Sequence, residues 1–478
     1  MNKIFKNYFY NLSYQILVLV VPLITTPYVS RILGAKCVGI YSYTNSIVQY
    51  FILFGCIGLS LYGQREIAYV QNDFEKRSHV FWELIFLRLI TVSLALILFF
   101  LTCVSNKKYG SIFFIMVLDI LAAMIDISWF FQGIEDFKKI VIRNFIIKVV
   151  GVILIFCCVK SAADLKIYVF CHSGTLLLGN LSMWFYMPKL VSKICIKELK
   201  IAGHLKNTII LFIPQIATSV YTILDKTMIG FLTGVEEEVA YYEQGQKIVK
   251  LVMMTVTSLG TVMLPRIANL YNEKKYDEIK KYMEKSFGFS FFLSFPMMFG
   301  LISISRIVVP WFFGGGYERV VPNMMTIAPI LVMISFSNII GTQYLLPIGR
   351  QKEYTISVII GCIVNFVMNL IFIPFFKSIG AAIASVIAET SVTSIQIYFT
   401  KRDFDYKLIL KNNIRYISAA VIMFFAVFSL SIKISASITS TIICVLFGAL
   451  VYICVLLLLK DQKILEIYKI IKKKKEKN

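Results

Sequence analysis

The chain has 478 residues, of which 58% are hydrophobic and only 16% are charged, and its formal net charge is +22. A soluble protein of this length carries about one quarter charged residues, so the composition argues against a predominantly soluble protein. Neither a Walker-type glycine loop nor a metal-binding spacing of cysteine and histidine is present. We therefore expect no enzyme activity, no metal site and no bound cofactor.

Apolar stretches, each about the length of a transmembrane helix of roughly 20 residues, follow one another along almost the whole chain. The short polar breaks between them leave no room for a soluble catalytic domain. The pattern predicts an all-α polytopic membrane protein with about 14 transmembrane helices. Their expected positions are residues 8–32, 38–63, 80–104, 110–132, 144–162, 165–187, 207–232, 239–265, 286–305, 322–347, 353–375, 379–400, 416–436 and 438–459.

The distribution of lysine and arginine predicts the orientation. Basic residues are concentrated in alternate loops, together with the two ends of the chain. The positive-inside rule therefore places both termini in the cytoplasm, which requires an even number of spans. The first apolar stretch lacks a small-residue cleavage site, so we expect a retained helix rather than a signal peptide. Because the basic residues lie on short membrane loops without a folded platform, nucleic-acid binding is not expected.

The two halves of the chain resemble each other. Five residues around the second predicted span recur at one constant offset around the eighth. A parallel repeat of two six-helix lobes around a central cavity would place these spans in the same direction. The pairs are Val38 with Val239, Tyr41 with Tyr242, Ile47 with Ile248, Val48 with Val249, and Arg65 with Arg266.

We accordingly expect an N-terminal lobe, a cytoplasmic linker, a C-terminal lobe and an appended helix pair with a basic tail, at residues 1–187, 188–206, 207–400 and 401–478. The linker alternates apolar and basic residues at helical spacing, which predicts an amphipathic helix at the membrane surface. Residues 271–285 suggest a second such helix, and both segments could equally be solvated connectors.

Charged residues interrupt several apolar spans. Counting residues from the loops places Arg88, Asp126 and Lys148 at similar depth in the first lobe, where they could form one cluster. A basic side chain at the centre of a transmembrane helix costs about 2.5–3.5 kcal/mol, so such residues should face protein or a watery cavity. The alternative to a functional role is that these charges only hold helices together.

A second cluster is expected in the other lobe from Asp225, Lys226, Lys247 and Lys250. Three cations against one carboxylate would leave positive charge for an anionic substrate, and phosphate or pyrophosphate suits such a site. Asp225 is also our candidate for carrying a proton or sodium ion that drives transport. Arg65 and Arg266 lie at the ends of their spans and are expected either to form a gate or to anchor helices at the headgroups.

Several segments resemble one family of transporters. PLITTPYVSRILGAKCVGIYSYTNSIVQYF from Pro22 is similar to the opening of Wzx-type polysaccharide flippases. DISWFFQGIEDFKK from Asp126, DKTMIGFLTG from Asp225 and GTQYLLPIGRQKEY from Gly341 resemble later spans of the same proteins, in the same order. The resemblance implies the multidrug/oligosaccharidyl-lipid/polysaccharide exporter superfamily, whose members have two six-helix lobes and work by alternating access.

This resemblance implies a function in the bacterial plasma membrane. Wzx-type proteins move undecaprenyl-pyrophosphate-linked oligosaccharides for capsule, O-antigen or exopolysaccharide assembly, so that lipid-linked sugar, membrane lipid and a polysaccharide polymerase are the expected partners. We expect Arg31, Lys226, Lys247 and Lys250 to contact the anionic head. Two alternatives of the same fold remain, a flippase for lipid II or another lipid-linked precursor and a drug/cation antiporter.

Overall fold

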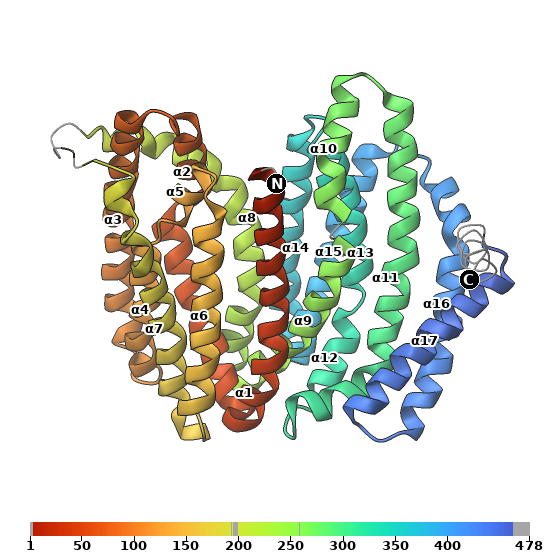
Figure 1. Ribbon diagram of the computed structural model, residues 1–478. Helices are drawn as coiled ribbons and strands as arrows, with labels where there is room; N and C mark the ends of the chain where they lie inside the picture. Colours follow the sequence, from red (N-terminus) through yellow and green to blue (C-terminus); the bar gives the residue numbers. More distant parts are fainter. Residues whose placement is uncertain (1–2, 193, 195–198, 258, 462–478) are drawn as a thin grey trace, which may run out of the picture. The chain divides into compact units, whose positions relative to one another are not determined.

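The structure is a computed structural model that describes residues 3–192, 194, 199–257 and 259–461, and these residues form helices and no β-strand (Figure 1). Ten of the helical segments are long and apolar enough to cross a membrane. The predicted all-α polytopic fold is therefore confirmed, and the chain is an integral membrane protein.

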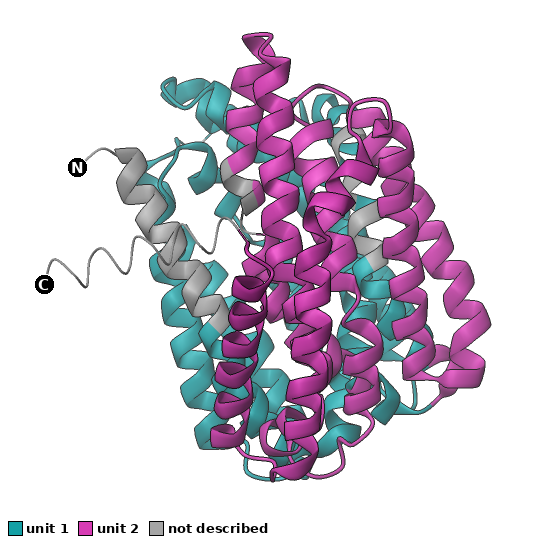
Figure 2. Cartoon of the chain, turned by 90° about the vertical axis from the view of Figure 1, so that its right-hand side faces the viewer, with its two compact units in different colours: residues 1–230, 235–240 teal, residues 231–234, 241–478 magenta. Residues whose placement is uncertain are grey.

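The chain divides into two compact units, coloured separately in Figure 2. Unit 1 comprises residues 1–230 and 235–240, and unit 2 comprises residues 231–234 and 241–478. The expected lobe boundary at residues 188–206 comes earlier in the chain than this division. The helix that follows the linker packs with unit 1, where its Thr227 hydroxyl lies 2.8 Å from the hydroxyl of Ser46.

Unit 1 begins with a long helical segment that is interrupted at Gly34, where φ is +74° and ψ is 169°. Glycine suits this position because a side chain is strained at positive φ. The segment Val20–Tyr69 has 50 residues, which would extend about 75 Å if straight, against about 30 Å for a bilayer core. It therefore holds two crossings, as the sequence predicts. The helices of unit 1 are α1 (Lys3–Cys56), α2 (Leu59–Tyr69), α3 (Phe74–Phe99), η1 (Phe100–Val104), α4 (Gly110–Met124), α5 (Ser128–Gly133), α6 (Phe137–Cys158), η2 (Ala162–Asp164), α7 (Leu165–Trp184), η3 (Met187–Lys189) and most of α8 (Ile201–Thr233).

Apart from residues 231–234, unit 2 starts at Tyr241 within α9 (Glu236–Thr257) and includes the rest of the chain. Its elements are most of α9, then α10 (Leu259–Asn272), α11 (Tyr276–Phe313), α12 (Val320–Ile327), α13 (Ile330–Ser337), the π-helical η5 (Asn338–Leu345), α14 (Gln351–Phe376), α15 (Ser378–Thr400), α16 (Tyr406–Lys433) and α17 (Ile438–Leu458). The surface helix expected at residues 271–285 is not separate, because α11 continues for 38 residues from Tyr276 through the apolar span.

The ten apolar segments are fewer than the predicted spans for two reasons. The long α1 holds two crossings, and three further predicted positions are occupied by α7, α8 and α9, which are not among the ten. Helix α9 has the sequence EEEVAYYEQGQKIVKLVMMTVT, in which charged and polar residues lower the hydropathy. Polar membrane helices of this kind are expected where protein or water, rather than lipid, surrounds the side chains.

The described part of the linker is not an amphipathic helix. Apart from the short η3, its described residues before Ile201 have no helical structure, and residues 193 and 195–198 lie outside the described part. The segment instead packs against α3. Arg77 donates to the Leu190 carbonyl at 2.9 Å, Trp82 Nε1 donates to the Ser192 carbonyl at 2.8 Å, and the Ser192 amide donates to Ser78 at 2.9 Å. These bonds satisfy backbone groups that a helix would have paired internally.

The repeated residues agree in burial at some positions and differ at others. Val38, Val48 and Val239 in unit 1 and Val249 in unit 2 are all buried. Tyr41 is partly buried, whereas its counterpart Tyr242 is fully buried.

Candidate functional site

A buried arginine and an aspartate form the charged centre of unit 1. Arg88 in α3 is 3% exposed, and its Nη1 donates to the main-chain carbonyl of Asp126 at 2.9 Å. Its Nη2 lies 3.8 Å from Asp126 Oδ2. The structure thus brings together two of the three residues that were expected to cluster in this lobe.

Arg143, and not Lys148, provides the second cation of this cluster. Arg143 Nη1 lies 3.7 Å from Asp126 Oδ1 and donates to Ser128 Oγ and Asn180 Oδ1, each at 2.9 Å. No ion pair joins Lys148 to Asp126 among the described residues. Positions five residues apart on α6 point in different directions, so only one of them can face this cluster.

The cluster surrounds a break between α4 and α5. The chain leaves the helix after Met124 and re-enters it at Ser128. The carbonyls at this break accept bonds from side chains: Asp126 from Arg88 and Trp129, Ile125 from Trp184, and Ala122 from Asn180. Backbone groups freed inside a membrane protein must be satisfied by such neighbours. The charges here therefore hold the broken helix, which favours the helix-holding role over substrate binding.

The second expected cluster is divided between the two units. Asp225 is 3% exposed and Lys226 is partly buried, and both belong to α8 in unit 1. Lys247 and Lys250 lie one turn apart on α9 in unit 2 and are also partly buried. Lys247 Nζ is 3.8 Å from Glu243, one turn earlier on the same helix. Arg31 belongs to α1 and is exposed.

Arg65 and Arg266 share a local arrangement as well as a repeat position. Arg65 is 2.9 Å from Glu66 and lies over the Tyr62 ring, 5.3 Å from its centroid. Arg266 is 3.9 Å from Glu278, with its guanidinium 5.4 Å from the centroid of the Tyr282 ring. Both side chains are more than 40% exposed. Each arginine thus has a glutamate and a tyrosine partner within its own unit, an arrangement that suits a gate or an anchor equally.

A histidine and a glutamate join the beginning of α8 to α2 and α3. His204 Nε2 lies 2.8 Å from Glu83 Oε2, and its Nδ1 lies 2.8 Å from the Tyr62 hydroxyl. The other oxygen of Glu83 accepts from the Lys200 amide at 2.7 Å. Both ring nitrogens of His204 and both carboxylate oxygens of Glu83 therefore have a hydrogen-bond partner. No group of residues that could hold a metal ion occurs in the described part of the chain.

Glu236, the first residue of α9, forms an ion pair and a hydrogen bond within unit 1. Its carboxylate lies 2.6 Å from Lys108 Nζ and accepts from the Tyr109 hydroxyl at 2.8 Å. Burial by itself would raise the pKa of Glu236, but the bonds from Lys108, from its own amide and from Tyr109 outweigh burial and lower it. The same carboxylate and the Tyr109 hydroxyl raise the pKa of Lys108.

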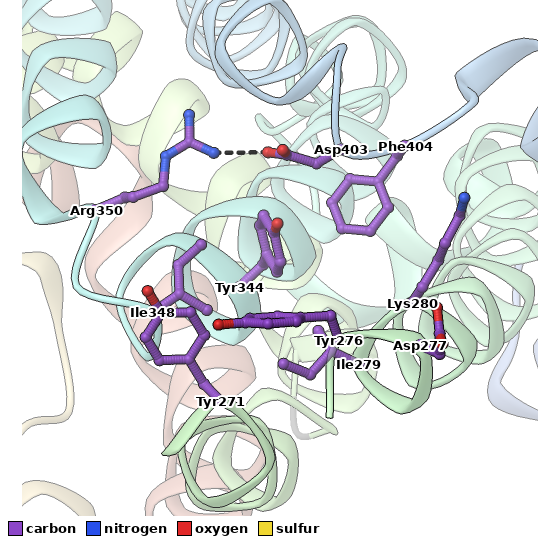
Figure 3. Close-up of a pocket in the computed structure, with 10 residues that line it drawn as sticks. All are labelled: Tyr271, Tyr276, Asp277, Ile279, Lys280, Tyr344, Ile348, Arg350, Asp403 and Phe404. Atoms are coloured by element: carbon purple, nitrogen blue, oxygen red, sulfur yellow. Dashed lines mark hydrogen bonds and ion pairs between the residues drawn. The ribbon is translucent and has the colours of Figure 1, made fainter. Parts of the chain in front are cut away.

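Unit 2 contains a pocket of about 410 Å³ where three connections meet, namely those between α10 and α11, η5 and α14, and α15 and α16 (Figure 3). The rings of three tyrosines and one phenylalanine border it, together with charged residues on two sides. Figure 3 shows Arg350 and Asp403 on one side and Lys280 with Asp277 on the other. Its lining residues are Tyr271, Tyr276, Asp277, Ile279, Lys280, Tyr344, Ile348, Arg350, Asp403 and Phe404.

Arg350 connects the walls of this pocket. Its Nη1 donates to Asp403 at 2.6 Å, its Nε to Glu353 at 3.0 Å, and its Nη2 to the Phe399 carbonyl at 2.9 Å. Asp403 lies in the connection between α15 and α16, and the short bond from Arg350 makes it part of the pocket wall. The i, i+3 spacing of Arg350 and Glu353 was visible in the sequence, whereas the contact with Asp403 is made across 53 residues.

Comparisons with known proteins agree with this architecture. A family model described as "Polysaccharide biosynthesis protein" matches residues 4–271, and a second, MatE, matches residues 211–371. The chain is 25% identical over 392 residues to an Escherichia coli K12 protein named "Putative O-antigen transporter", covering 80% of this chain and 93% of that protein. A Shigella dysenteriae protein of the same name is 24% identical over 375 residues, 78% of this chain and 93% of that protein.

Two solved structures share the fold. An inward closed conformation of the lipid II flippase MurJ superposes with a TM-score of 0.78 at 17% identity, covering 94% of this chain and 99% of that one. An inward-facing multidrug resistance MATE transporter of the MOP superfamily gives a TM-score of 0.65 at 12% identity, covering 83% of this chain and 96% of that one. The resemblance inferred from the sequence is thereby confirmed.

Proposed function

Because this chain belongs to the family of polysaccharide biosynthesis proteins, we propose that it is a flippase for undecaprenyl-pyrophosphate-linked oligosaccharide repeat units in the bacterial plasma membrane. The proposal takes its substrate class from the relatives named as O-antigen transporters, which this chain matches over most of their length. The substrate moves by alternating access and is not chemically altered. Both termini lie in the cytoplasm, where the basic loops are expected.

The observation that carries the proposal is the presence of partly accessible lysines within membrane helices. Lys226 on α8, and Lys247 and Lys250 on α9, are only partly buried, and Lys247 is 35% exposed. Cations in membrane helices are costly unless protein, water or an anion compensates them. A pyrophosphate is such an anion, and it can pair with several lysines at once.

In this proposal Arg31, Lys226, Lys247 and Lys250 contact the pyrophosphate or the sugar, and Arg65 and Arg266 act as gate or anchor. Asp225 takes part in coupling to a proton or sodium gradient. A substrate shifts the balance between inward and outward states only if it binds them with different affinity. The lysines are therefore expected to bind the pyrophosphate more tightly in the state that loads substrate.

The test is transport by the purified chain in proteoliposomes. Undecaprenyl-pyrophosphate-linked oligosaccharide is placed in one leaflet, and its arrival in the other is followed by access of an added lectin. We expect the triple variant Lys226→Ala, Lys247→Ala, Lys250→Ala to slow transport about tenfold or more, because the pyrophosphate loses three cationic partners. A tenfold loss corresponds to about 1.4 kcal/mol of lost stabilisation. The matched control removes three exposed lysines of unit 2, Lys352, Lys407 and Lys411.

Two further arms separate the alternatives. Lipid II in place of the oligosaccharide tests the lipid II alternative, and a fluorescent cationic drug tests the antiporter. Equal rates for the triple variant and its control would remove the lysines from the mechanism. Movement of drug without movement of lipid-linked oligosaccharide would establish the antiporter instead. An Asp225→Asn variant that loses its response to an imposed pH or sodium gradient, while it still transports, would identify the coupling residue.

A further inference from the structure

A second pocket of unit 2 is lined by positive charge. It has a volume of about 540 Å³ and lies between the first turns of α11 and those of α16. Three lysines of α11 line it, Lys280, Lys281 and Lys285, and Arg415 of α16 lines it from the other helix. None of the residues expected to bind the transported substrate belongs to this pocket.

The three lysines are not neutralised by neighbours. Among the residues that the structure describes, none of Lys280, Lys281 and Lys285 forms an ion pair; the ring of Tyr282 lies 5.9 Å from Lys285 Nζ. The lining contains two carboxylates, Glu284 and Asp405, against its four cations.

The two acidic groups nearest to the α16 side already have partners. Asp405 Oδ1 accepts from the Leu408 amide at 3.0 Å and so caps the start of α16. Asp461 is fully buried, and its Oδ2 lies 2.7 Å from Arg415 Nε. This buried contact fixes the guanidinium in place at the wall of the pocket. The three α11 lysines face one lining carboxylate on their own helix, Glu284, so they supply the excess positive charge that a ligand can match.

Apolar residues continue the pocket along the membrane helices. Leu408 lines it and is 48% exposed, and Phe289, one turn beyond Lys285, is 38% exposed. Ile409 on α16 also lines the pocket and is buried beneath it. Both helices are long apolar segments that can cross a membrane. The pocket therefore lies where a cationic helix end passes into an apolar surface. An anionic lipid has the matching order, with a negative phosphate at the membrane surface and acyl chains below it.

We propose that this pocket, formed by Lys280, Lys281, Lys285 and Arg415, binds the phosphate group of an anionic phospholipid whose acyl chains lie along α11 and α16. A phosphate oxygen accepts charge-assisted bonds from several lysines, which are point-charge donors for phosphate. Asn412 and Asn413, which also line the pocket, supply neutral polar groups for a glycerol head. The binding does not rest on the proposed transport function.

Binding is measured on the full chain purified in detergent, by native mass spectrometry and by thermal stabilisation. The probes are phosphatidylglycerol, phosphatidylcholine of the same acyl chains, and inorganic phosphate. We expect phosphatidylglycerol to bind more tightly than phosphatidylcholine. We also expect the variant Lys280→Gln, Lys281→Gln, Lys285→Gln to lose about tenfold or more of that preference, because each lysine near a lipid phosphate contributes separately.

A charge-matched control removes three exposed lysines of the same unit, Lys352→Gln, Lys407→Gln, Lys411→Gln, and should keep the preference. A third variant, Lys280→Arg, Lys281→Arg, Lys285→Arg, keeps the positive charge and should keep the preference for phosphatidylglycerol. It tests the proposal even if the glutamine variant folds poorly. Inorganic phosphate that binds through the same lysines, without any preference for phosphatidylglycerol, would support a phosphate site but reject the lipid. Equal behaviour of the pocket variant and the control would overturn the proposal.

Discussion

The two units contain the same turn, at the ends of α5 and η5, but stabilise it with opposite charges. In unit 1 the amide of Asp136 donates to the Phe131 carbonyl at 2.8 Å, after Glu135 with φ of +59°. In unit 2 the amide of Arg350 donates to the Leu345 carbonyl at 2.9 Å, after Gly349 with φ of +82°.

The ion pair that follows each turn has the same spacing and the reverse polarity. Asp136 pairs with Lys139 at 2.9 Å, and Arg350 pairs with Glu353 at 3.0 Å. The two turns end a helix in the same way because a left-handed residue after the helix satisfies its last carbonyls. The sign of the charge is free to differ, since the backbone bonds do not depend on it.

The units also differ in where their arginines are placed. Unit 1 has Arg88 and Arg143 at the interruption between α4 and α5, where they compensate broken backbone and one carboxylate. Unit 2 places Arg350 at the end of its helices, beside a pocket. The buried arginines of unit 1 hold a broken helix, whereas Arg350 of unit 2 holds neighbouring connections together at the edge of a pocket.

The largest effect is expected for Arg88→Leu. Removing this buried cation leaves the Asp126 carboxylate with Arg143, 3.7 Å away, as its remaining cation and removes one of the two hydrogen bonds to the Asp126 carbonyl. The loss should cost about 3–5 kcal/mol of unfolding free energy. The measurement is thermal unfolding in detergent. Arg306→Leu, which removes an exposed arginine from α11 of unit 2, should change stability by less than about 1 kcal/mol. Equal losses for the two variants would contradict the difference between the units.

A smaller loss is expected when the ion pair of unit 2 is reversed by Arg350→Asp with Glu353→Lys. The new aspartate would face Asp403 and lose the bonds to Asp403 and Phe399, which should cost about 1.5–3 kcal/mol. The same thermal unfolding measures it. Adding Asp403→Arg to the double variant should recover part of the loss, and no recovery would show that the pair with Asp403 is not its cause.

Reversal of the pair of unit 1, by Asp136→Lys with Lys139→Asp, should have little effect. The pair is partly exposed, and Lys139 Nζ also lies 5.2 and 4.9 Å from the centroids of the Phe131 and Tyr186 rings. We therefore expect a loss of about 1 kcal/mol or less. A loss as large as that in unit 2 would mean that the polarity of this turn matters in both units.

The smallest effect concerns pH at the contact between Glu236 and Lys108 in unit 1. The pKa of Glu236 is lowered in the folded state, so its contribution to stability is present above the unfolded pKa of about 4.3. This contribution is lost as the pH falls through the pKa that Glu236 has in the folded state. Thermal unfolding between pH 3 and 7 should be less pH-dependent in Glu236→Gln than in the matched control Glu237→Gln. Identical pH profiles would remove this contact from the acid sensitivity.

Of three charged contacts in the structure, the sequence predicted both members of one, one member of the second and neither member of the third. Arg88 and Asp126 were predicted together, because counting residues from a loop gives their depth. Arg143 was missed, because depth does not say which side of α6 faces the cluster. Arg350 was missed for a related reason: its main partner, Asp403, comes from a distant connection.

The linker and the helix boundaries show the same distinction. Gly34 was placed correctly in a break between two spans, because positive φ and a run of apolar residues too long for one crossing are local properties. In the segment 188–206 the structure shows the short η3 and the beginning of α8, and the described residues between them bond to α3 instead of forming a helix.

By itself the sequence determined that this is an all-helical membrane protein of two related halves with cations inside its helices, since hydropathy, spacing and charge are properties of the chain alone. Only the tertiary structure decided which cations hold broken helices and which line pockets. The position of each cation depends on the rotation of its helix and on contacts between residues far apart in the chain. The periodicity of a single segment predicts neither of these.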